Sequence, residues 1–247
     1  MILVLGGTAE ARELAGALDS AGVPVTSSLA GRVSRPRLPA GAVRIGGFGG
    51  PEALARWLSE HGVVAVIDAT HPFAERISAS AAVACPRAGV PLLRLQRPGW
   101  SEGPGDDWHW VADLDAAAAA IPSLGERVLL TTGRQGLAAF AGVQGAWFLV
   151  RCVERPDPPL PAGHRLLLDR GPYTVEGELA LIEEHRIDLV VSKDSGGAHT
   201  EAKLEAARRR GLPVIVVQRP PRPTVATVST IADALAWWRE RERAHAG

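Results

Sequence analysis

Continuous apolar runs alternate with helical patterns along the whole chain, and this alternation constrains the fold more than any other feature. Segments rich in Ala, Leu, Glu and Arg, which favour helices, separate most of these runs. Strands that are apolar on both faces are typical of parallel sheets covered by helices. The fold class is therefore α/β. The predicted strands are residues 2–6, 23–28, 42–47, 63–70, 91–95, 127–133, 146–150, 165–169, 187–192 and 212–217.

The stretch RPGWSEGPGDDWHW, at residues 97–110, interrupts the alternation with polar residues, Gly and Pro. Half of the predicted strands precede it and half follow, so we place a domain boundary near residues 97–100. We expect two Rossmann-like domains with mainly parallel sheets, at residues 1–97 and 98–228, and an active-site crevice between them. Residues 229–247 predict a C-terminal helix that packs on either domain and begins with a capping box at Thr230 and Asp233.

Composition excludes several classes of protein. The 27 basic and 27 acidic residues give a net charge of zero, which argues against a nucleic-acid-binding protein. No apolar run has the length of a membrane span, and the N-terminus starts with a strand, so we expect a cytoplasmic protein that binds no membrane. Cys85 and Cys152 lie far apart without nearby ligand spacing, which predicts neither a disulfide nor a metal site. Both are interpreted as buried hydrophobic residues.

The opening sequence ILVLGGTAEARELA predicts a strand, a glycine turn and a helix that begins near Thr8. Such a turn directs backbone N–H groups and the positive end of the helix dipole at one point, where a phosphate binds well. Ala11 replaces the third glycine of the full dinucleotide motif, so two interpretations stay open. Gly6, Gly7 and Thr8 form either a nucleotide or anion site, or a tight turn without a ligand.

The second predicted strand ends in VTSSLAGRVSRPR, which contains no carboxylate. An Asp or Glu at this position selects NAD, whereas hydroxyls and guanidinium groups bind the 2′-phosphate of NADPH. Ser28, Gly31 and Arg32 are the candidate residues, with Arg35 and Arg37 as alternatives to Arg32. This pattern favours NADPH, and a solvated basic loop is the alternative.

The stretch DATHPFAERIS follows the fourth predicted strand, and Pro72 suits the first turn of the next helix. Asp68, Thr70 and His71 are therefore expected at the carboxyl edge of the sheet, where ligands of this fold bind. They either cap a helix or form a polar site that faces a nicotinamide or a substrate.

The second half repeats the arrangement of strand, small polar residues and helix in LLTTGRQGLAAF and VVSKDSGGAHTEAK. Arg134 and Lys193, beside two expected helix N-termini, predict a site for carboxylates or phosphates. Arg170 and Tyr173 follow another strand. Capping and turn formation are the alternative for each motif. The YxxxK pair of many short-chain reductases is missing, as are GxSxG, GxxxxGK[ST] and HExxH.

Taken together, GGTAEAR, DATHPFA and SKDSGG resemble the precorrin-6A reductase family of cobalamin biosynthesis, in the right order and spacing across the whole chain. The resemblance implies an oxidoreductase of two α/β domains that uses NADPH to reduce a double bond of the tetrapyrrole precorrin-6A, giving precorrin-6B. The partner it implies is this small molecule, with transient contact to neighbouring pathway enzymes as a further expectation.

The resemblance also implies roles for the candidate residues. The cofactor site would comprise Gly6, Gly7, Thr8, Ser28, Gly31, Arg32 and Thr70. The tetrapyrrole, which carries many carboxylates, would bind at Arg134, Arg170, Lys193, Asp194, Ser195 and Gly196. The hypothesis for catalysis is that His71, Asp68 or Tyr173 donates or relays a proton, with solvent as the alternative donor.

Two other classes of function stay open from the residues. A cofactor-free tetrapyrrole enzyme with a similar crevice, such as a ring-closing synthase, would need no glycine turn. A dinucleotide-sensing regulatory module would need the first half of the chain without the cations of the second half.

Overall fold

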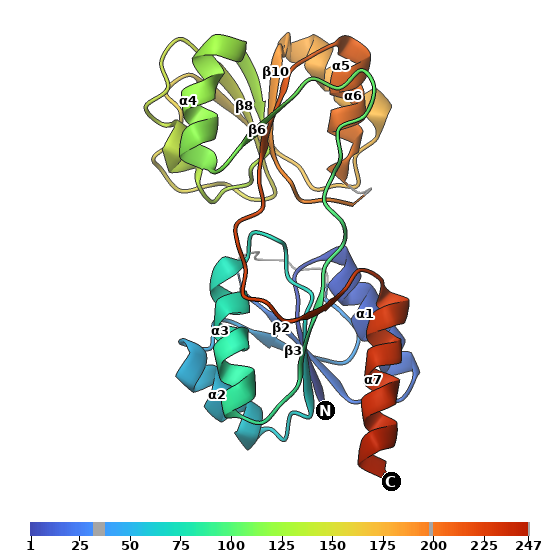
Figure 1. The fold of residues 1–247 in the computed structure, drawn as a ribbon. Coiled ribbons are helices and arrows are strands. Elements are labelled where there is room, and N and C mark those ends of the chain that lie inside the picture. Colours follow the sequence, from blue (N-terminus) through green and yellow to red (C-terminus); the bar gives the residue numbers. More distant parts are fainter. Residues whose placement is uncertain (32–37, 198–199, 247) are drawn as a thin grey trace. The chain divides into compact units, whose positions relative to one another are not determined.

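A computed structural model of the chain describes residues 1–31, 38–197 and 200–246 (Figure 1). The chain forms two compact units. The first combines Met1–Pro98 with the returning segment Pro221–Gly247, and the second is Gly99–Pro220. Each unit has its own six-stranded parallel sheet.

The sheet of the first unit has the strand order β12-β5-β4-β1-β2-β3. Its strands are β1 (Ile2–Leu5), β2 (Val25–Leu29), β3 (Ala42–Ile45), β4 (Ala65–Asp68), β5 (Leu92–Leu95) and β12 (Ala226–Val228). One face carries α1 (Ala9–Ser20) and α7 (Ile231–Ala246), and the other carries α2 (Pro51–Glu60) and α3 (Glu75–Arg87) (Figure 1). The central strands are buried because helices cover both faces.

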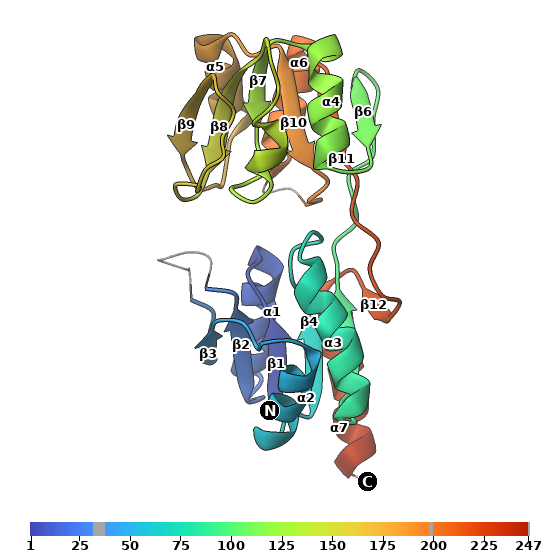
Figure 2. The same cartoon turned by 90° about the vertical axis from the view of Figure 1, so that its left-hand side faces the viewer.

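The sheet of the second unit has the order β6-β11-β10-β7-β8-β9 (Figure 2). Its strands are β6 (Trp108–Val111), β7 (Arg127–Leu130), β8 (Trp147–Cys152), β9 (His164–Leu168), β10 (Leu189–Lys193) and β11 (Val214–Val217). Helix α4 (Leu114–Leu124) and the short 3-10 helix η1 (Leu137–Phe140) cover one face. The other face carries α5 (Val175–His185) and α6 (Ala202–Arg210) (Figure 1).

Within each unit the order is that of a Rossmann fold, in which the sixth place is taken by a strand from elsewhere in the chain, β12 in the first sheet and β6 in the second. In the first sheet, β2 and β3 lie on one side of β1, while β4 and β5 lie on the other. The second sheet repeats this layout around β7, with β8 and β9 on one side and β10 and β11 on the other. The two points where the order reverses, between β1 and β4 and between β7 and β10, are where ligands bind in such sheets.

The predicted α/β class with parallel sheets is confirmed, and each of the ten predicted strands is present. The sequence analysis missed β6 and β12, which are edge strands with partly exposed side chains and no continuous apolar run. It also assigned residues 221–228 to the second domain, whereas β12 pairs with β5 of the first sheet. The physical reason is that β12 contributes only three residues, and strand pairing over such a distance leaves no local pattern.

The C-terminal helix packs on the first unit, where α7 contacts α1. Half of the predicted capping box is present, since Thr230 Oγ1 accepts a hydrogen bond from Asp233 N at 3.1 Å, while the Asp233 carboxylate accepts from Thr230 Oγ1 at 2.6 Å. Ala234, Trp237 and Trp238 extend the apolar core between α1 and the sheet. Both cysteines are buried, as predicted. No helix of the described residues is long and apolar enough to span a membrane.

Candidate functional site

The glycine turn lies where the strand order of the first sheet reverses. Gly6 and Gly7 follow β1, and Gly6 N donates to Ser28 O of β2 at 3.0 Å. Gly7 has a φ of +115°, a backbone conformation that side chains with a Cβ rarely adopt. A Cβ added at Gly7 would meet no atom within 4 Å, so the turn presents open, approachable backbone. This geometry suits a ligand that contacts main-chain N–H groups.

Thr8 joins the two strands that flank this reversal point. Its Oγ1 donates to Ala69 O, which follows β4, at 2.8 Å, and accepts from Ala11 N at 3.1 Å as the N-cap of α1. One hydroxyl therefore fixes the start of α1 against the end of β4. A cavity of about 10 Å³, lined in part by Thr8, Thr70 and Pro72, lies at the same edge. It has room for about one water molecule.

Ser28 and Arg44 lie opposite each other at the carboxyl ends of β2 and β3. The Arg44 guanidinium donates to Gly46 O at 2.5 Å and to Gly47 O at 2.7 Å, and approaches Ser28 Oγ at 3.5 Å. It stacks on the Phe48 ring at 3.8 Å, and partial burial lowers its pKa. A positive charge beside a buried serine hydroxyl is thus present at the end of β2, where Rossmann folds distinguish the two nicotinamide cofactors.

The residues predicted beside Ser28 are only partly described. Gly31 has a φ of +70°, and a Cβ there would approach Ile45 Cγ2 to 3.2 Å. Arg32, Arg35 and Arg37 lie outside the described residues. Arg44 was missed by the sequence analysis because it is distant in sequence from the second strand. The register between β2 and β3 is what brings it to Ser28.

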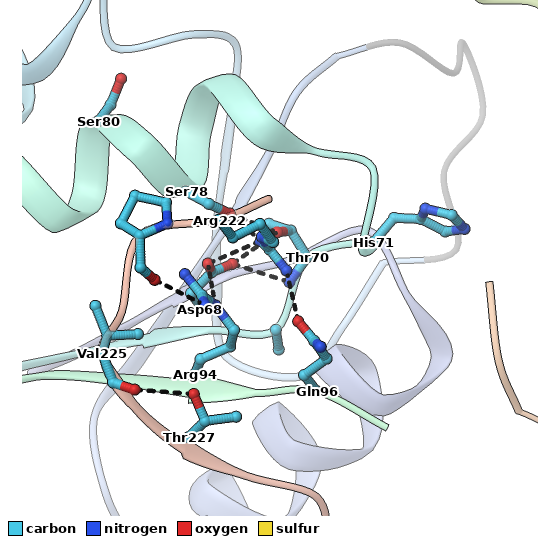
Figure 3. A network of polar contacts seen from close by, with 12 residues as sticks. Asp68, Thr70, His71, Ser78, Ser80, Arg94, Gln96, Arg222, Val225 and Thr227 are labelled. Carbon is cyan, nitrogen blue, oxygen red and sulfur yellow. Dashed lines mark hydrogen bonds and ion pairs between the residues drawn. The ribbon is translucent and has the colours of Figure 1, made fainter. Parts of the chain in front are cut away.

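A buried polar network surrounds Asp68 at the end of β4 (Figure 3). Arg222 Nη2 donates to Asp68 Oδ2 at 3.0 Å and also contacts Ser78 Oγ, while Arg94 Nε lies 3.6 Å from the same carboxylate oxygen. Asp68 Oδ1 accepts from Thr70 Oγ1 at 2.6 Å. Only 1% of Asp68 is exposed, so its carboxylate is enclosed by protein groups.

This network attaches the returning segment to the first sheet. Arg222 Nη1 donates to Gln96 Oε1 at 3.0 Å, and Arg94 Nη1 donates to Pro223 O at 3.0 Å. Arg94 and Arg222 were not anticipated, because nothing in the sequence links residue 222 to residue 68. This geometry favours another role for Asp68 than the predicted one of proton donor. Its carboxylate accepts hydrogen bonds from the Arg222 guanidinium and the Thr70 hydroxyl and forms an ion pair with Arg94, so it binds and orients these groups.

His71 lies just beyond Asp68 and Thr70, and its ring points away from the network (Figure 3). Its Nδ1 accepts a hydrogen bond from Phe73 N at 3.2 Å. In the neutral ring, the acceptor role of Nδ1 places the proton on Nε2. A neutral His71 therefore donates from Nε2.

In the second unit, the Asp194 carboxylate is occupied by neighbouring protein groups. Its Oδ1 accepts from Trp100 N at 3.0 Å, and its Oδ2 forms an ion pair with Arg219 Nε at 3.0 Å. A Cβ at Gly99 would approach Asp194 Oδ2 to 2.6 Å, so glycine is required there for this contact. Asp194 was predicted to bind substrate. Its described contacts hold Trp100 and Arg219, near the two ends of the second unit, to the end of β10.

The other predicted substrate residues lie at the carboxyl ends of three strands of the second sheet, β10, β7 and β9. Lys193 ends β10, and Ser195 Oγ lies 3.0 Å from Thr200 Oγ1. Gly196 has a φ of +62°, as a tight turn requires. Arg134, beyond β7, is 3.7 Å from Glu154. Arg170, beyond β9, is exposed, and its backbone N donates to Asp169 Oδ1 at 2.7 Å.

Tyr173 lies beside a buried ion pair. The Arg151 guanidinium stacks on the Tyr173 ring at 3.9 Å and donates to Glu178 Oε1 at 2.5 Å. The Tyr173 hydroxyl donates to Asp169 O at 3.3 Å. Burial raises the pKa of Tyr173, so the phenol keeps its proton at neutral pH. Arg151 and Glu178 were not predicted, although the position of Glu178 in the first turn of α5 matches the preference of acidic residues for helix N-termini.

Comparison with known proteins identifies the family. The family model described as precorrin-6x reductase CbiJ/CobK matches residues 1–239. The chain belongs to this family. A precorrin-6A reductase of Rhodococcus erythropolis is 55% identical over 238 residues, covering 96% of each chain. One of Mycobacterium tuberculosis is 50% identical over the same length and coverage. The solved structure named CobK precorrin-6A reductase matches with a TM-score of 0.90 and 42% identity, covering 97% of this chain and 96% of that chain.

The resemblance stated from the three sequence motifs to the precorrin-6A reductase family is therefore confirmed. Within this precorrin-6x reductase family chain, the predicted cofactor residues and His71 belong to the first unit, whereas Tyr173 and the predicted substrate residues belong to the second. Among the described residues, no group of three or more His, Cys, Asp or Glu side chains is arranged to hold a metal ion.

Proposed function

We propose that this chain is an NADPH-dependent precorrin-6A reductase, which reduces one double bond of the macrocycle to give precorrin-6B in cobalamin biosynthesis. The family match over residues 1–239 supports a reductase of this class. The observation that supports a nicotinamide cofactor is the glycine turn at the reversal point of a Rossmann-type sheet. We also propose that the enzyme works in the cytoplasm, on a small-molecule substrate.

The cofactor would bind on the first unit. Backbone N–H groups of the Gly6–Gly7 turn and the start of α1 would hold the pyrophosphate, because helix N-termini attract anions. The open space at Gly7 fits this group, since the backbone there is not screened by a side chain. Ser28 and Arg44 would bind the 2′-phosphate, together with Arg32 from the sequence prediction. Gly31 and Thr70 complete the proposed cofactor residues.

The tetrapyrrole would bind through cations of the second unit. Lys193, Arg134 and Arg170 lie at the carboxyl ends of three strands of one sheet, where a substrate rich in carboxylates has charge-assisted partners. Ser195 and Gly196 would supply a hydroxyl and backbone N–H groups in the turn after β10. Asp194 supports this turn through its contacts with Trp100 and Arg219.

The proposed reaction adds a hydride to one carbon of a conjugated double bond and a proton to its partner atom. Bound NADPH would supply the hydride and leave as NADP⁺. His71 is the preferred proton donor of this chain, because its Nε2 carries the proton when Nδ1 accepts from Phe73 N. Asp68 acts as a positioning residue, orienting Thr70 beside His71. Tyr173, with its raised pKa, is the alternative donor from the second unit.

The test measures NADPH consumption with precorrin-6A by the purified protein and by His71→Ala and Tyr173→Phe. We expect turnover by the wild type, a loss of about 10²- to 10⁴-fold in kcat for the variant of the proton donor, and unchanged NADPH affinity. His109→Ala, a partly exposed histidine of β6, is the matched control. Failure of the wild type to consume NADPH with this substrate would reject the proposed function.

A separate titration tests the cofactor site. Binding of NADPH and NADH is measured by fluorescence for the wild type, Arg44→Met and Arg32→Ala. Losing one charge-assisted contact to the 2′-phosphate should reduce the preference for NADPH about tenfold or more. Arg56→Met, an exposed arginine of α2, should leave it unchanged. An unchanged preference in both test variants would show that other residues bind the 2′-phosphate.

A further inference from the structure

Lys203 is one of only two lysines among the 27 basic residues, and only 4% of its surface is exposed. It lies near the start of α6. Its Nζ donates to Thr200 O and lies 4.8 Å from the centroid of the Trp100 ring. Lysine is rarely buried to this degree unless its ammonium group is paired. The contacts of the ammonium group with Thr200 O and the Trp100 ring therefore indicate the role of this side chain.

The charged groups that face Lys203 come from three elements. Arg151 of β8 and Glu178 of α5 form a buried ion pair of 2.5 Å, and Glu201 immediately precedes α6. Within the described part of the chain, Glu178 Oε2 is buried without a hydrogen-bond partner. Two cations thus face one buried carboxylate and one carboxylate at the start of the helix. The balance of charge in this cluster depends on the proton of Lys203.

Lys203 is connected to the turn after β10 by two contacts in series. Its Nζ donates to Thr200 O, and Thr200 Oγ1 lies 3.0 Å from Ser195 Oγ. Ser195 N in turn donates to Lys193 O at 2.6 Å, and Asp194 N donates to Val217 O at 2.9 Å. A buried side chain therefore supports the segment whose cation and hydroxyl are the proposed carboxylate ligands.

We propose that Lys203 is a positioning residue, which acts through Thr200 and Ser195 to hold the turn after β10 in the form that binds the carboxylates of the tetrapyrrole. The identity of the ligand rests on the proposed function. The positioning of the turn does not, because it follows from contacts within the second unit. Lys203 does not touch the substrate in this proposal.

The proposal predicts a dependence on pH. Burial lowers the pKa of Lys203 from 10.5 to about 7, with the Arg151 charge acting in the same direction and Glu178 and Glu201 opposing it. Because the pKa of Lys203 lies below its ordinary value, burial disfavours the ammonium form more than the Trp100 ring and the carboxylates favour it. Protonation should therefore favour an opened turn in which water solvates the ammonium group, so the turn should loosen as the pH falls through about 7, and tetrapyrrole binding should weaken with it.

Hydrogen exchange of the Asp194 and Ser195 amides, corrected for the intrinsic effect of pH, tests the positioning without any ligand. In the wild type we expect protection to rise about tenfold between about pH 6 and pH 8, because openings that solvate the protonated Lys203 become less favourable as the proton leaves. In Lys203→Met, protection should be low and independent of pH. Arg209→Met is the matched control, since Arg209 is a largely exposed cation of the same helix.

Titration with precorrin-6A then tests the consequence for binding. Lys203→Met should weaken its affinity about tenfold and flatten its pH dependence, while NADPH affinity stays at the wild-type value. If the wild type does not bind precorrin-6A but its amides respond to Lys203→Met, the positioning stands and the proposed function fails. Wild-type protection and wild-type pH dependence in a folded Lys203→Met variant would overturn the proposal.

A second variant keeps the test decisive if Lys203→Met does not fold. Thr200→Val removes the hydroxyl that meets Ser195 and keeps the carbonyl that accepts from Lys203. We expect it to abolish the pH dependence of Ser195 protection while leaving the pKa of Lys203 lowered. Retention of the wild-type pH dependence in Thr200→Val would show that Lys203 does not act through this path.

Discussion

The two sheets share a strand layout but differ in what lies at equivalent positions of their central strands. In the first sheet, Asp68 of β4 pairs in register with Arg94 of β5, and both are buried. The equivalent positions of the second sheet, in β10 and β11, hold Val191 and Ile215. One sheet therefore has a charged pair where the other has an apolar pair, in the same backbone geometry.

The charged pair and the apolar pair differ because each sheet binds a segment that is distant in sequence at a different place. The first sheet must bind the chain that returns at residues 221–228, and Asp68 does so through Arg222. The second sheet holds Trp100 and Arg219, at the two ends of its unit, through Asp194 just beyond β10, and positions 191 and 215 stay apolar. Because desolvation offsets much of the attraction in a buried ion pair, we infer that the first network specifies the docking position of the returning segment rather than adding stability.

A common feature of the two sheets is a threonine that bridges the reversal point. Thr8 Oγ1 donates to Ala69 O at 2.8 Å, and Thr131 Oγ1 donates to Val191 O at 3.0 Å. Only Thr8 also caps a helix of more than one turn. In both sheets a threonine hydroxyl thus binds a carbonyl across the reversal point. The glycine turn with φ of +115° belongs to the first sheet.

The largest effect should come from breaking the charged pair. Asp68→Asn leaves two buried guanidinium groups without their carboxylate, and should lower the free energy of unfolding of the first unit by about 3–5 kcal/mol. Denaturant unfolding followed at residues of each unit would measure it. A triple variant, Asp68→Val with Arg94→Ile and Arg222→Met, imitates the second sheet and should recover part of the loss. If Asp68→Asn alone leaves the free energy of unfolding unchanged, the charged pair of the first sheet does not contribute to its stability.

The next effect concerns the glycine turn. Gly7→Ala forces a Cβ into a backbone region with φ of +115° and places it on the proposed pyrophosphate surface, so NADPH affinity should fall about 100-fold, or about 3 kcal/mol. Gly22→Ala, where φ is +73° after α1, imposes similar strain away from the site. It should reduce stability but not NADPH affinity. Equal affinities for the two variants would remove the glycine turn from the cofactor site.

A smaller difference should separate the two bridging threonines. Thr8→Val removes both a helix cap and a strand-to-strand hydrogen bond, so we expect a loss of about 2 kcal/mol in the free energy of unfolding. Thr131→Val removes only the second kind of contact and should lose about 1 kcal/mol. Thermal unfolding of the two variants at equal pH measures the difference. Equal losses would mean that the cap contributes nothing at α1.

The most gradual effect is a pH dependence carried by Lys203. Its folded pKa of about 7 lies below its unfolded value of 10.5, so the unfolded chain binds more protons between these pH values. The stability contributed by this residue is therefore fully present above pH 10.5 and is lost as the pH falls through about 7, by at most about 1.4 kcal/mol per pH unit. The unfolding free energies of the wild type and Lys203→Met should diverge in favour of the wild type as the pH rises. Parallel curves would place the pKa of Lys203 near its ordinary value.

The sequence by itself determined the parallel α/β class, ten of the twelve strands that the structure describes and the three motifs that identify the family. These features are local: an apolar run buries both faces of a strand, and a glycine turn needs neighbouring residues only. Gly6, Gly7 and Thr8 lie within three positions, so their shared role as a turn and helix cap was visible in the sequence.

Tertiary structure alone decided which distant residues meet. Arg222 reaches Asp68 across more than 150 positions, and Arg44 reaches Ser28 through strand register. Lys203 became significant only when burial placed it beside Trp100 and Thr200. The physical reason is that an ion pair or a shifted pKa depends on distance and desolvation in space, whereas a sequence pattern records only spacing along the chain.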